Sequence, residues 1–435
     1  MGYHLVTGPL AEQLPLLRRL AGPDGPLPLA STLPPTTIPA WPSMFTGRDP
    51  GQLGIYGFRH RYGRGYDDFQ PYDSTLVTAP FCWERLSERG HAVVVIGVPG
   101  TWPPRPLHGA LVSGFPVPRP AGVYCWPPYL AEEIGRDFPG YRTDISGYRG
   151  DDPEVLLERI RAMVGARLQL ARRWLRRRDW ELFVLAEIGT DRLHHALWHT
   201  WSPEHPRYRP GAGLAGAIPA FYRWLNDELS ELVEAAGPET AVLLVSDHGT
   251  QTMRGGFRIN RWLLENGYLY LRGSPPPGQP LQARHVDWSR TRAWARGGYA
   301  ARIYLNIRGR EPRGIVAAEQ AAGLVEELAM ALARLDAPPG PIDCLPHLPG
   351  KSWRACAGLP ADLLLEIGGW AWRALGSLGT GKELFSAEND TGPDSANHHP
   401  LGILAGGPAA GLPPAAEGDI PLTRVNDLIL DFFTA

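Results

Sequence analysis

The stretch ELFVLAEIGTDRLHH, residues Glu181–His195, joins an apolar run to polar residues that can bind a metal. Its first part, Glu181–Glu187, has the length and composition of a buried strand. Asp191 and His195 follow, four residues apart. On a helical turn this spacing places both side chains on one face, within reach of one cation. A carboxylate at a helix start beside an unrelated histidine would give the same pattern, so the pair alone leaves both interpretations open.

Two further apolar runs, His91–Val98 and Ala241–Ser246, also read as buried strands. The three strands follow segments with helical periodicity, namely Trp83–Arg89, Val155–Arg178 and Ile218–Ala236. Strands that alternate with helices predict an α/β fold with an open, mostly parallel sheet flanked by helices. Ligands gather at the carboxyl ends of such strands.

The remaining segments are expected to form loops and one further helix around this sheet. Pro99–Gly150, Pro339–Gly350 and Ser386–Pro400 are rich in turn-forming residues and are predicted to be loops. Val316–Leu335 has helical periodicity. No linker or internal repeat is apparent, so one domain over residues 1–435 is predicted.

Asp247-His248-Gly249 comes directly after the run AVLLVS. Adjacent side chains at the end of a strand are expected to point apart, so Asp247 and His248 would address two neighbouring metals. Turn formation explains such a tripeptide equally well. His398 lies in SANHHPLGILAGGP, a predicted polar loop, and on its own reads as a surface histidine.

Thr37 lies in the proline-rich segment LPPTTIPAWPSMFTG. An aliphatic hydroxyl becomes a good nucleophile when a metal lowers its pKa and holds it in line. A threonine in a loop fixed by prolines, beside a two-metal site, suits that role. The alternative is a helix cap close to Pro39.

Composition, net charge and cysteine content limit the classes of function that the protein can have. The chain has 435 residues, 43% of them hydrophobic and 20% charged, which is typical of a globular protein. The net charge of −2 offers no basic field for nucleic acid. The four cysteines form no CxxC pair, so buried free thiols are expected. No apolar run approaches the ~20 residues that span a bilayer, no signal peptide is visible, and a cytoplasmic location without membrane association is expected.

Several motifs together resemble the type I phosphodiesterase/nucleotide pyrophosphatase family of the alkaline phosphatase-like superfamily. The segment TTIPAWPSMFTGRDPGQLGI resembles the family's nucleophile segment, with Thr37 in the position of the nucleophile. The further matches, in order along the chain, are Asp191–His195, Asp247–Gly249, Ile259–Leu269, Tyr304–Val316 and His398. Each motif is modest, but their correct order makes the resemblance specific.

The resemblance implies a metal-dependent phosphohydrolase with two divalent cations. It assigns Asp191, His195 and His398 to one cation and Asp247 and His248 to the other. Nitrogen and oxygen ligands of this mix suit zinc, and manganese is compatible. The implied reaction is in-line attack on phosphorus by the threonine, followed by hydrolysis of a phosphothreonine. The expected substrate is a small phosphate ester or a nucleotide-like molecule.

The sequence departs from the family at its start. Members of the family open with a strand that ends in Asp-Gly, and that aspartate completes the second metal site. Leu14–Gly22 already resembles the first helix, and neither Glu12 nor Asp24 is well placed to substitute. We therefore expect the first strand to be missing, through truncation or through degeneration of the second site. Truncation is favoured because every other ligand is present. A smaller departure is Leu53, where the family commonly has histidine.

Three alternatives stay open at this stage. A phosphomonoesterase or a mutase of the same superfamily would use the same residues. A non-catalytic descendant that binds a phosphorylated ligand would explain the missing aspartate. A sulfatase is disfavoured, because Thr37 cannot form the aldehyde that sulfatases require.

Overall fold

The computed structural model describes residues 1–118, 122–147, 152–211, 213–337, 340–407, 410–412 and 418–434. The chain divides into two units. Unit 1 consists of Met1–Phe58, Tyr72–Thr250 and His399–Ala435. Unit 2 consists of Arg59–Pro71 and Gln251–His398. A single phosphohydrolase domain over residues 1–435 stays a prediction.

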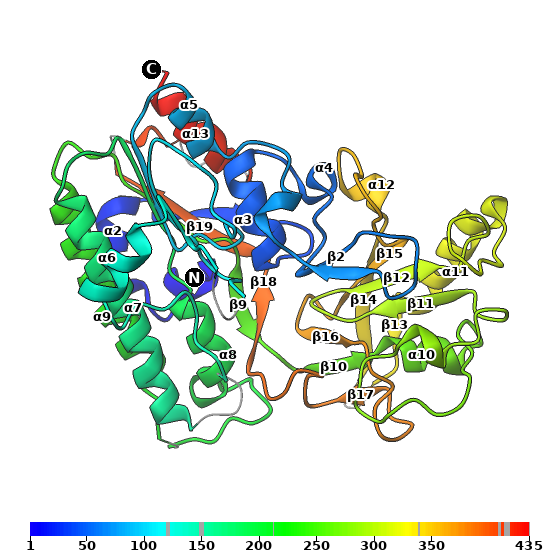
Figure 1. The fold of residues 1–435 in the computed structure, drawn as a ribbon. Coiled ribbons are helices and arrows are strands. Elements are labelled where there is room, and N and C mark those ends of the chain that lie inside the picture. The colour runs from blue at the N-terminus through cyan, green and yellow to red at the C-terminus, as the bar shows by residue number, and fades with distance from the viewer. Residues whose placement is uncertain are drawn as a thin grey trace. The chain divides into compact units, whose positions relative to one another are not determined.

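Unit 1 contains two four-stranded sheets (Figure 1). The first has the order β6 (Cys125–Trp126), β5 (Gly109–Val112), β4 (Val93–Ile96) and β7 (Leu182–Leu185). In it β4 is parallel to both β5 and β7. The second has the order β20 (Ile420–Pro421), β1 (Leu27–Ala30), β19 (Leu401–Gly406) and β8 (Leu243–Val245). Here β19 is antiparallel to both β1 and β8, so the α/β class is confirmed but the sheets are mixed.

The helices of unit 1 form two groups. One group contains the first part of the predicted nucleophile segment, which forms α3 (Thr37–Thr46). In this group α3 and α5 (Cys82–Glu88) both contact α13 (Arg424–Phe432). In the other group α7 (Pro153–Leu175), α8 (Gly189–Trp201) and α9 (Ala217–Ala236) contact one another (Figure 1). The shorter helices are α1 (Tyr3–Val6), η1 (Ala11–Gln13), α2 (Pro15–Ala21), α4 (Pro50–Leu53), η2 (Ser74–Leu76) and α6 (Leu130–Asp137). In the described residues 1–26, α2 is preceded by α1 and η1 and by no strand.

The three strands predicted from apolar runs all form, but they are buried to different degrees. The four residues of β4 are fully buried, because the strand has neighbours on both edges and helices on its faces. Val93 and Val95 face the core shared with α3, α5 and α13. The residues of β7 and β8 are only half-buried, although they are equally apolar. The expectation that these two strands are buried is therefore wrong.

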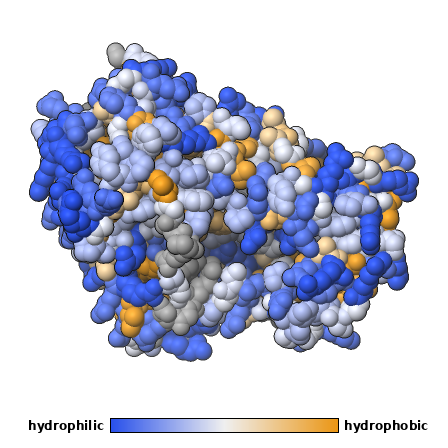
Figure 2. All heavy atoms as spheres, in the orientation of Figure 1, coloured by the Kyte–Doolittle hydropathy of each residue, from blue (hydrophilic) through white to orange (hydrophobic). Residues whose placement is uncertain are grey.

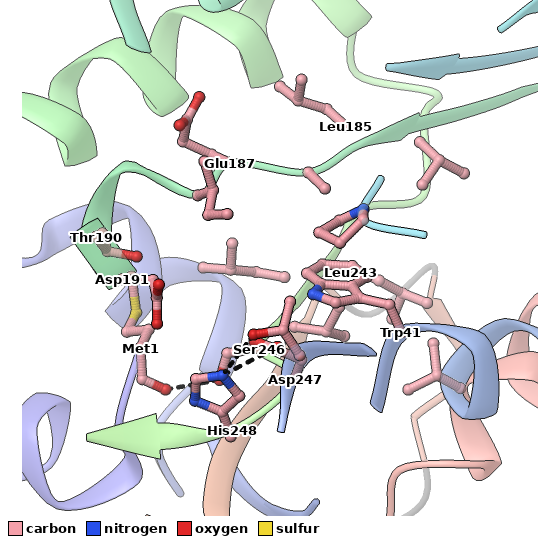
Figure 3. A pocket seen from close by; sticks show the side chains of 18 of the residues that line it. Met1, Trp41, Leu185, Glu187, Thr190, Asp191, Leu243, Ser246, Asp247 and His248 are labelled. Carbon is pink, nitrogen blue, oxygen red and sulfur yellow. Dashed lines mark hydrogen bonds and ion pairs between the residues drawn. The ribbon is translucent and has the colours of Figure 1, made fainter. Parts of the chain in front are cut away.

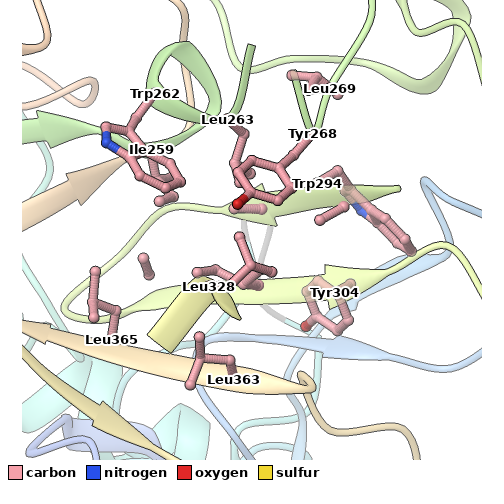
Figure 4. Packing of buried hydrophobic residues seen from close by; sticks show 14 of the residues in the cluster. Ile259, Trp262, Leu263, Tyr268, Leu269, Trp294, Tyr304, Leu328, Leu363 and Leu365 are labelled. Atoms are coloured by element: carbon pink, nitrogen blue, oxygen red, sulfur yellow. The ribbon is translucent and has the colours of Figure 1, made fainter. Parts of the chain in front are cut away.

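Unit 2 is built on an antiparallel sheet of five strands. Its order is β11 (Ala293–Arg296), β12 (Ala301–Leu305), β15 (Leu363–Ile367), β14 (Ile342–His347) and β13 (Arg334–Leu335). Further elements are β2 (Arg59–Arg61), β3 (Phe69–Pro71), β10 (Gly255–Arg258), α10 (Ile259–Glu265), η3 (Ala283–His285), η4 (Ala318–Gln320), α11 (Ala321–Leu332), α12 (Pro349–Ser352), β16 (Trp372–Leu375) and β17 (Phe385–Ser386). Trp294 and Tyr304 stack with their rings 5.4 Å apart inside an apolar cluster that includes Leu328 (Figure 4).

All three predicted loops contain regular structure. Pro339–Gly350 includes β14, Pro99–Gly150 includes β5, β6 and α6, and Ser386–Pro400 includes Ala396–His399 as β18. Short strands give weak sequence signals, which explains these errors. Residues 119–121, 148–150 and 339, which belong to these segments, lie outside the described residues. Strands β9 (Gly249–Thr252) and β18 (Ala396–His399) pair with each other, and each contains a boundary between the units.

The surface and the cysteines agree in part with expectation. The face drawn in Figure 2 is mainly hydrophilic, with apolar residues scattered in small groups. Cys82, Cys125 and Cys344 are buried, whereas Cys356 is exposed, contrary to prediction. Within the described ranges, no helix combines the length and apolar character that crossing a membrane requires.

Candidate active site

The first predicted ligand pair lies on one helix of unit 1. Helix α8 begins at Gly189, shortly after β7, and Asp191 is in its first turn. The Nε2 atom of the buried His195 lies 3.4 Å from Oδ1 of Asp191. The predicted helical spacing is confirmed, and the pair offers one oxygen and one nitrogen on the same face of α8.

Arg192 holds the other oxygen of Asp191, a role that sequence reasoning missed. Its Nη1 lies 2.7 Å from Oδ2 of Asp191. Its Nε and Nη2 donate to the two carboxylate oxygens of Asp144 at 2.8 and 2.9 Å. Arg192 therefore fixes the rotamer of Asp191, and Asp144 in turn fixes Arg192. The only sequence signal was an arginine beside Asp191, because Asp144 lies in a segment predicted to be irregular.

The second predicted pair follows β8. His248 Nε2 and Asp247 Oδ2 are 3.2 Å apart, so the two side chains converge. The expectation that they point apart is wrong, because the chain leaves the extended conformation after Ser246. His248 Nδ1 lies 2.9 Å from the carbonyl oxygen of Gly249. A carbonyl oxygen only accepts, so Nδ1 donates to it, and Nε2 is the ring nitrogen that faces the Asp247 carboxylate.

Burial makes Asp247 an unfavourable place for a bare negative charge. Desolvation raises the pKa of its carboxyl group, against the opposing effect of His248 and the α-amino group of Met1. Desolvation likewise lowers the pKa of that buried α-amino group, while Asp247 and Asp191 act to raise it. Ser246 fixes the first residue by donating from Oγ to the Met1 carbonyl oxygen at 2.6 Å (Figure 3). Met1 was not among the predicted site residues.

Thr37 is the first residue of α3, with Thr36 at the N-cap position. The hydroxyl of the buried Thr37 lies 3.5 Å from His248 Nε2. The hydroxyl of Thr36 is buried and has no hydrogen-bond partner among the described residues. It does not cap the helix. Of the two neighbouring threonines, Thr37 is thus the one that faces the Asp247–His248 pair.

A cavity of about 260 Å³ connects these groups within unit 1. Thr37, Asp191, Asp247 and His248 line it, and Trp41 and Phe45 from α3 form an apolar part of its wall (Figure 3). The two aromatic rings stack 5.9 Å apart. The site thus has acidic and imidazole groups at one end and an aromatic surface beside them.

His194, the neighbour of the predicted ligand His195, has a different role. Its Nε2 lies 3.0 Å from the Tyr222 hydroxyl, and its Nδ1 lies 2.8 Å from Thr250 Oγ1. Desolvation lowers its pKa well below the usual value, which favours the neutral ring. Both ring nitrogens are engaged, which agrees with its exclusion from the predicted ligands.

His398 belongs to unit 2 as its last residue. It is buried on β18 and not in a loop, so the interpretation as a surface histidine is wrong. Its Nε2 lies 2.6 Å from the hydroxyl of Tyr299. Arg373 lies over the ring of Tyr299, with Cζ 3.5 Å from the centroid. Within unit 2 the His398 ring thus contacts Tyr299, which Arg373 covers in turn.

Comparison with known proteins identifies the family and the fold of the chain. The Type I phosphodiesterase / nucleotide pyrophosphatase family matches residues 6–363. Phosphonoacetate hydrolase from Sinorhizobium meliloti, solved with phosphonoformate, is 16% identical with a TM-score of 0.57, over 98% of this chain and 90% of that one. Human ectonucleotide pyrophosphatase/phosphodiesterase 5 is 14% identical with a TM-score of 0.51, over 97% and 89%.

The murine form of the latter protein was solved as an inactive threonine-to-alanine variant with AMP. It is 12% identical with a TM-score of 0.52, over 99% of this chain and 91% of that one. No curated protein matches the sequence. At these identities the structural likeness shows the fold, and it confirms the predicted alkaline phosphatase-like architecture.

Proposed function

Because the chain belongs to the type I phosphodiesterase/nucleotide pyrophosphatase family, we propose that it hydrolyses phosphodiester or pyrophosphate bonds with Thr37 as nucleophile and bound divalent cations. Membership makes it a phosphohydrolase of the phosphodiesterase/pyrophosphatase type. The observation that carries the proposal is the 3.5 Å approach of the Thr37 hydroxyl to His248. This approach puts a hydroxyl beside converging acidic and imidazole side chains in one cavity.

The start of α3 suits a phosphoryl group. The first N–H groups of a helix have no intrahelical partner, and the helix dipole favours negative charge there. Thr37 is the first residue of this ten-residue helix, so its hydroxyl stands next to such N–H groups. A phosphoryl group bound at this end would have its phosphorus within reach of Thr37.

The donor set fits divalent cations. The His248 ring and the Asp247 carboxylate offer a nitrogen and an oxygen 3.2 Å apart, a pair that suits one cation. Asp191 and His195 offer a second oxygen–nitrogen pair at 3.4 Å. Such mixed ligands suit zinc. A bound cation would lower the pKa of a hydroxyl and neutralise charge on phosphoryl oxygens.

We assign His398 to the cation of Asp191 and His195. The assignment rests on the sequence motif that His398 completes. Imidazole nitrogen is a common zinc ligand, so His398 would add a second nitrogen to the donors of Asp191 and His195.

The reaction forms one bond and breaks another in its first step. Thr37 Oγ1 loses its proton and attacks phosphorus, the bond to the leaving alcohol or phosphate breaks, and the leaving group takes up a proton. Water then attacks the same phosphorus and releases the threonine. The murine relative is inactive as a threonine-to-alanine variant, which supports a threonine in this role.

The wall of the cavity favours a substrate with an organic group on phosphorus. Trp41 lines the cavity and is only half-buried, so its face is available for stacking. Ile38 and Tyr56 are buried in the core, and Arg61 pairs with Glu311 in the interior of unit 2. Phosphonoacetate and AMP, with which structural relatives were solved, each carry one organic group, as any monoester does, so they do not distinguish the two ester classes. Family membership favours a diester or a nucleotide-like substrate over a simple monoester.

Two alanine variants test the nucleophile. Thr37→Ala should lower kcat for an aryl phosphodiester by at least about 10³-fold, since removal of a nucleophile has effects of this size or larger. Thr36→Ala is the matched control, with the same atoms removed one residue away, and should change kcat less than about tenfold. Circular dichroism and metal content should be unchanged in both.

The same assay separates the alternatives. A wild-type kcat/KM higher for the matching monoester would favour a phosphomonoesterase and remove the diester proposal. A larger effect of Thr36→Ala than of Thr37→Ala would transfer the nucleophile to Thr36. Absence of turnover with both ester classes, in protein loaded with zinc or manganese, would favour the non-catalytic descendant.

A further inference from the structure

Three consecutive residues of unit 2 form a turn with left-handed backbone. The φ angles of Gly368, Gly369 and Trp370 are 57°, 61° and 68°. Glycine adopts such angles without a steric penalty, whereas a residue as bulky as tryptophan adopts them only with strain. Strained residues persist where the surrounding contacts fix them, and they cluster at functional sites.

The contacts of this turn hold it in place within unit 2. The Trp370 side chain is buried, and its ring stacks on that of His347 with the centroids 6.2 Å apart. His347 is fixed in turn by Glu366, whose Oε2 lies 3.0 Å from its Nε2. On the backbone, Gly368 donates its N–H to the carbonyl oxygen of Asp343 at 3.0 Å. The turn is therefore held both by its main chain and by its tryptophan ring.

Two carbonyl oxygens of the turn accept hydrogen bonds from amide side chains. Gln251 Nε2 donates to the carbonyl oxygen of Gly369 at 2.8 Å and to that of His398 at 2.9 Å. Asn397 Nδ2 donates to the carbonyl oxygen of Trp370, and its Oδ1 accepts from the N–H of His398 at 3.1 Å. Carbonyl oxygens only accept and an N–H only donates, so both amide orientations are determined. Each main-chain polar group of His398 is thus tied to the turn through one side chain.

We propose that the turn Gly368–Trp370 positions His398 for its cation, with Gln251 and Asn397 as the positioning residues. The inference rests on the proposed role of His398 as a cation ligand. The φ angle of Trp370 sets the direction of the Gly369 carbonyl relative to its own, so the strained conformation serves to aim both oxygens at the two amides. A ligand that is already fixed loses less conformational freedom when the metal binds. Groups that orient a metal ligand in this way typically raise affinity about 10- to 100-fold.

The first test is the zinc affinity of Gln251→Met, which keeps the length of the side chain and removes both donated hydrogen bonds. The dissociation constant for zinc should rise at least about tenfold, and excess zinc should restore kcat. Gln320→Met makes the same change at an exposed position and should leave zinc affinity unchanged. A fall in the Tm of metal-free Gln251→Met with an unchanged dissociation constant would indicate a purely structural role and overturn the proposal.

A pair of glycine variants tests the turn itself. Gly369 and Gly273 have φ angles of 61° and 73°, and an added Cβ would meet no atom within 4 Å at either position. Alanine therefore introduces similar backbone strain at both, and each variant should lose about 2 to 4 °C of Tm. Only Gly369→Ala should also raise the dissociation constant for zinc. Equal zinc affinities of the two variants would contradict a positioning role for the turn.

His398→Ala distinguishes this inference from the proposed function. Loss of zinc affinity in His398→Ala, but in neither Gln251→Met nor Gly369→Ala, would overturn the positioning role and keep His398 as a ligand. Unchanged zinc affinity in His398→Ala would remove the ligand assignment and the positioning role with it. Weaker zinc binding in all three variants, with both controls at the wild-type value, is the expected result.

Discussion

The five-stranded sheet of unit 2 is hydrogen-bonded without a break from β11 to β13, whereas the strands of unit 1 form two sheets that end at β7 and β8. Unit 2 contains buried polar pairs in its interior. Arg61 pairs with Glu311, both side chains being almost fully buried, and Tyr66 donates to Asn306 at 2.7 Å. Unit 1 instead brings Asp247 and His248 to within 3.2 Å of each other beside a cavity.

This difference separates stability from chemistry. A buried polar group that is fully paired specifies the core, and its loss is paid in folding free energy. Ionisable groups gathered beside a cavity, with burial raising the pKa of one of them as at Asp247, indicate a functional site. Substitutions in unit 2 should therefore affect unfolding, and substitutions around Asp247 should affect turnover.

The largest effect is expected in unit 1. Asp247→Asn should lower kcat/KM for an aryl phosphodiester by about 10³- to 10⁴-fold, equal to about 4 to 5.5 kcal/mol, because it removes charge from the proposed cation site. The Tm of the metal-free protein should not fall, since a neutral amide costs less to bury than a carboxylate. Asp343→Asn alters an exposed carboxylate and serves as the control. Equal losses in both variants would contradict the assignment.

A change in the aromatic core of unit 2 should have the reverse pattern. Trp294 packs against the rings of Tyr66, Trp288 and Tyr304. Trp294→Ala should reduce the free energy of unfolding by about 3 to 5 kcal/mol through the cavity it leaves. Urea denaturation measures the loss, and Leu345→Ala, at an exposed position, should cost less than about 0.5 kcal/mol. A loss of kcat, measured on the folded Trp294→Ala variant and larger than its loss of stability when both are expressed as free energies, would contradict the claim that unit 2 serves stability and unit 1 serves turnover.

A smaller effect is expected at the residue that orients Asp191. Arg192→Lys keeps the charge but cannot contact Asp144 with two nitrogens and Asp191 with a third. The dissociation constant for zinc should rise about 10- to 100-fold. Excess zinc should restore kcat, which distinguishes orientation from catalysis. Arg424→Lys, at an exposed ion pair, is the control, and unchanged zinc affinity in Arg192→Lys would show that Asp191 needs no such support.

The sequence predicted those parts of the site that depend on local patterns of residues. The spacing of Asp191 and His195 was sufficient to place them on one helical face, and three apolar runs were sufficient for β4, β7 and β8. Contacts between distant segments could not be predicted this way. Asp144 reaches Arg192 from another part of the chain, and the convergence of Asp247 and His248 depends on how the backbone turns after β8.

The placement of strands in sheets was also beyond local patterns. An apolar run indicates a strand but not the neighbours it pairs with, so β4 and β7 gave the same signal although only β4 is buried on both edges. The strand β14 was missed because its short run IDCLPH contains a proline, which weakens a strand signal. The position of His398 on a strand was missed because ANHH has one apolar residue and no apolar alternation.

The most direct test of the central claim is to trap the covalent adduct on the enzyme. A bis-aryl phosphodiester is mixed with protein loaded with zinc, the reaction is stopped by acid during the first turnovers, and peptides are mapped by mass spectrometry. The account predicts an aryl phosphoryl group on Thr37, absent from the Thr37→Ala variant and present in Thr36→Ala. Steady turnover with no adduct, or an adduct on any other residue, would contradict it.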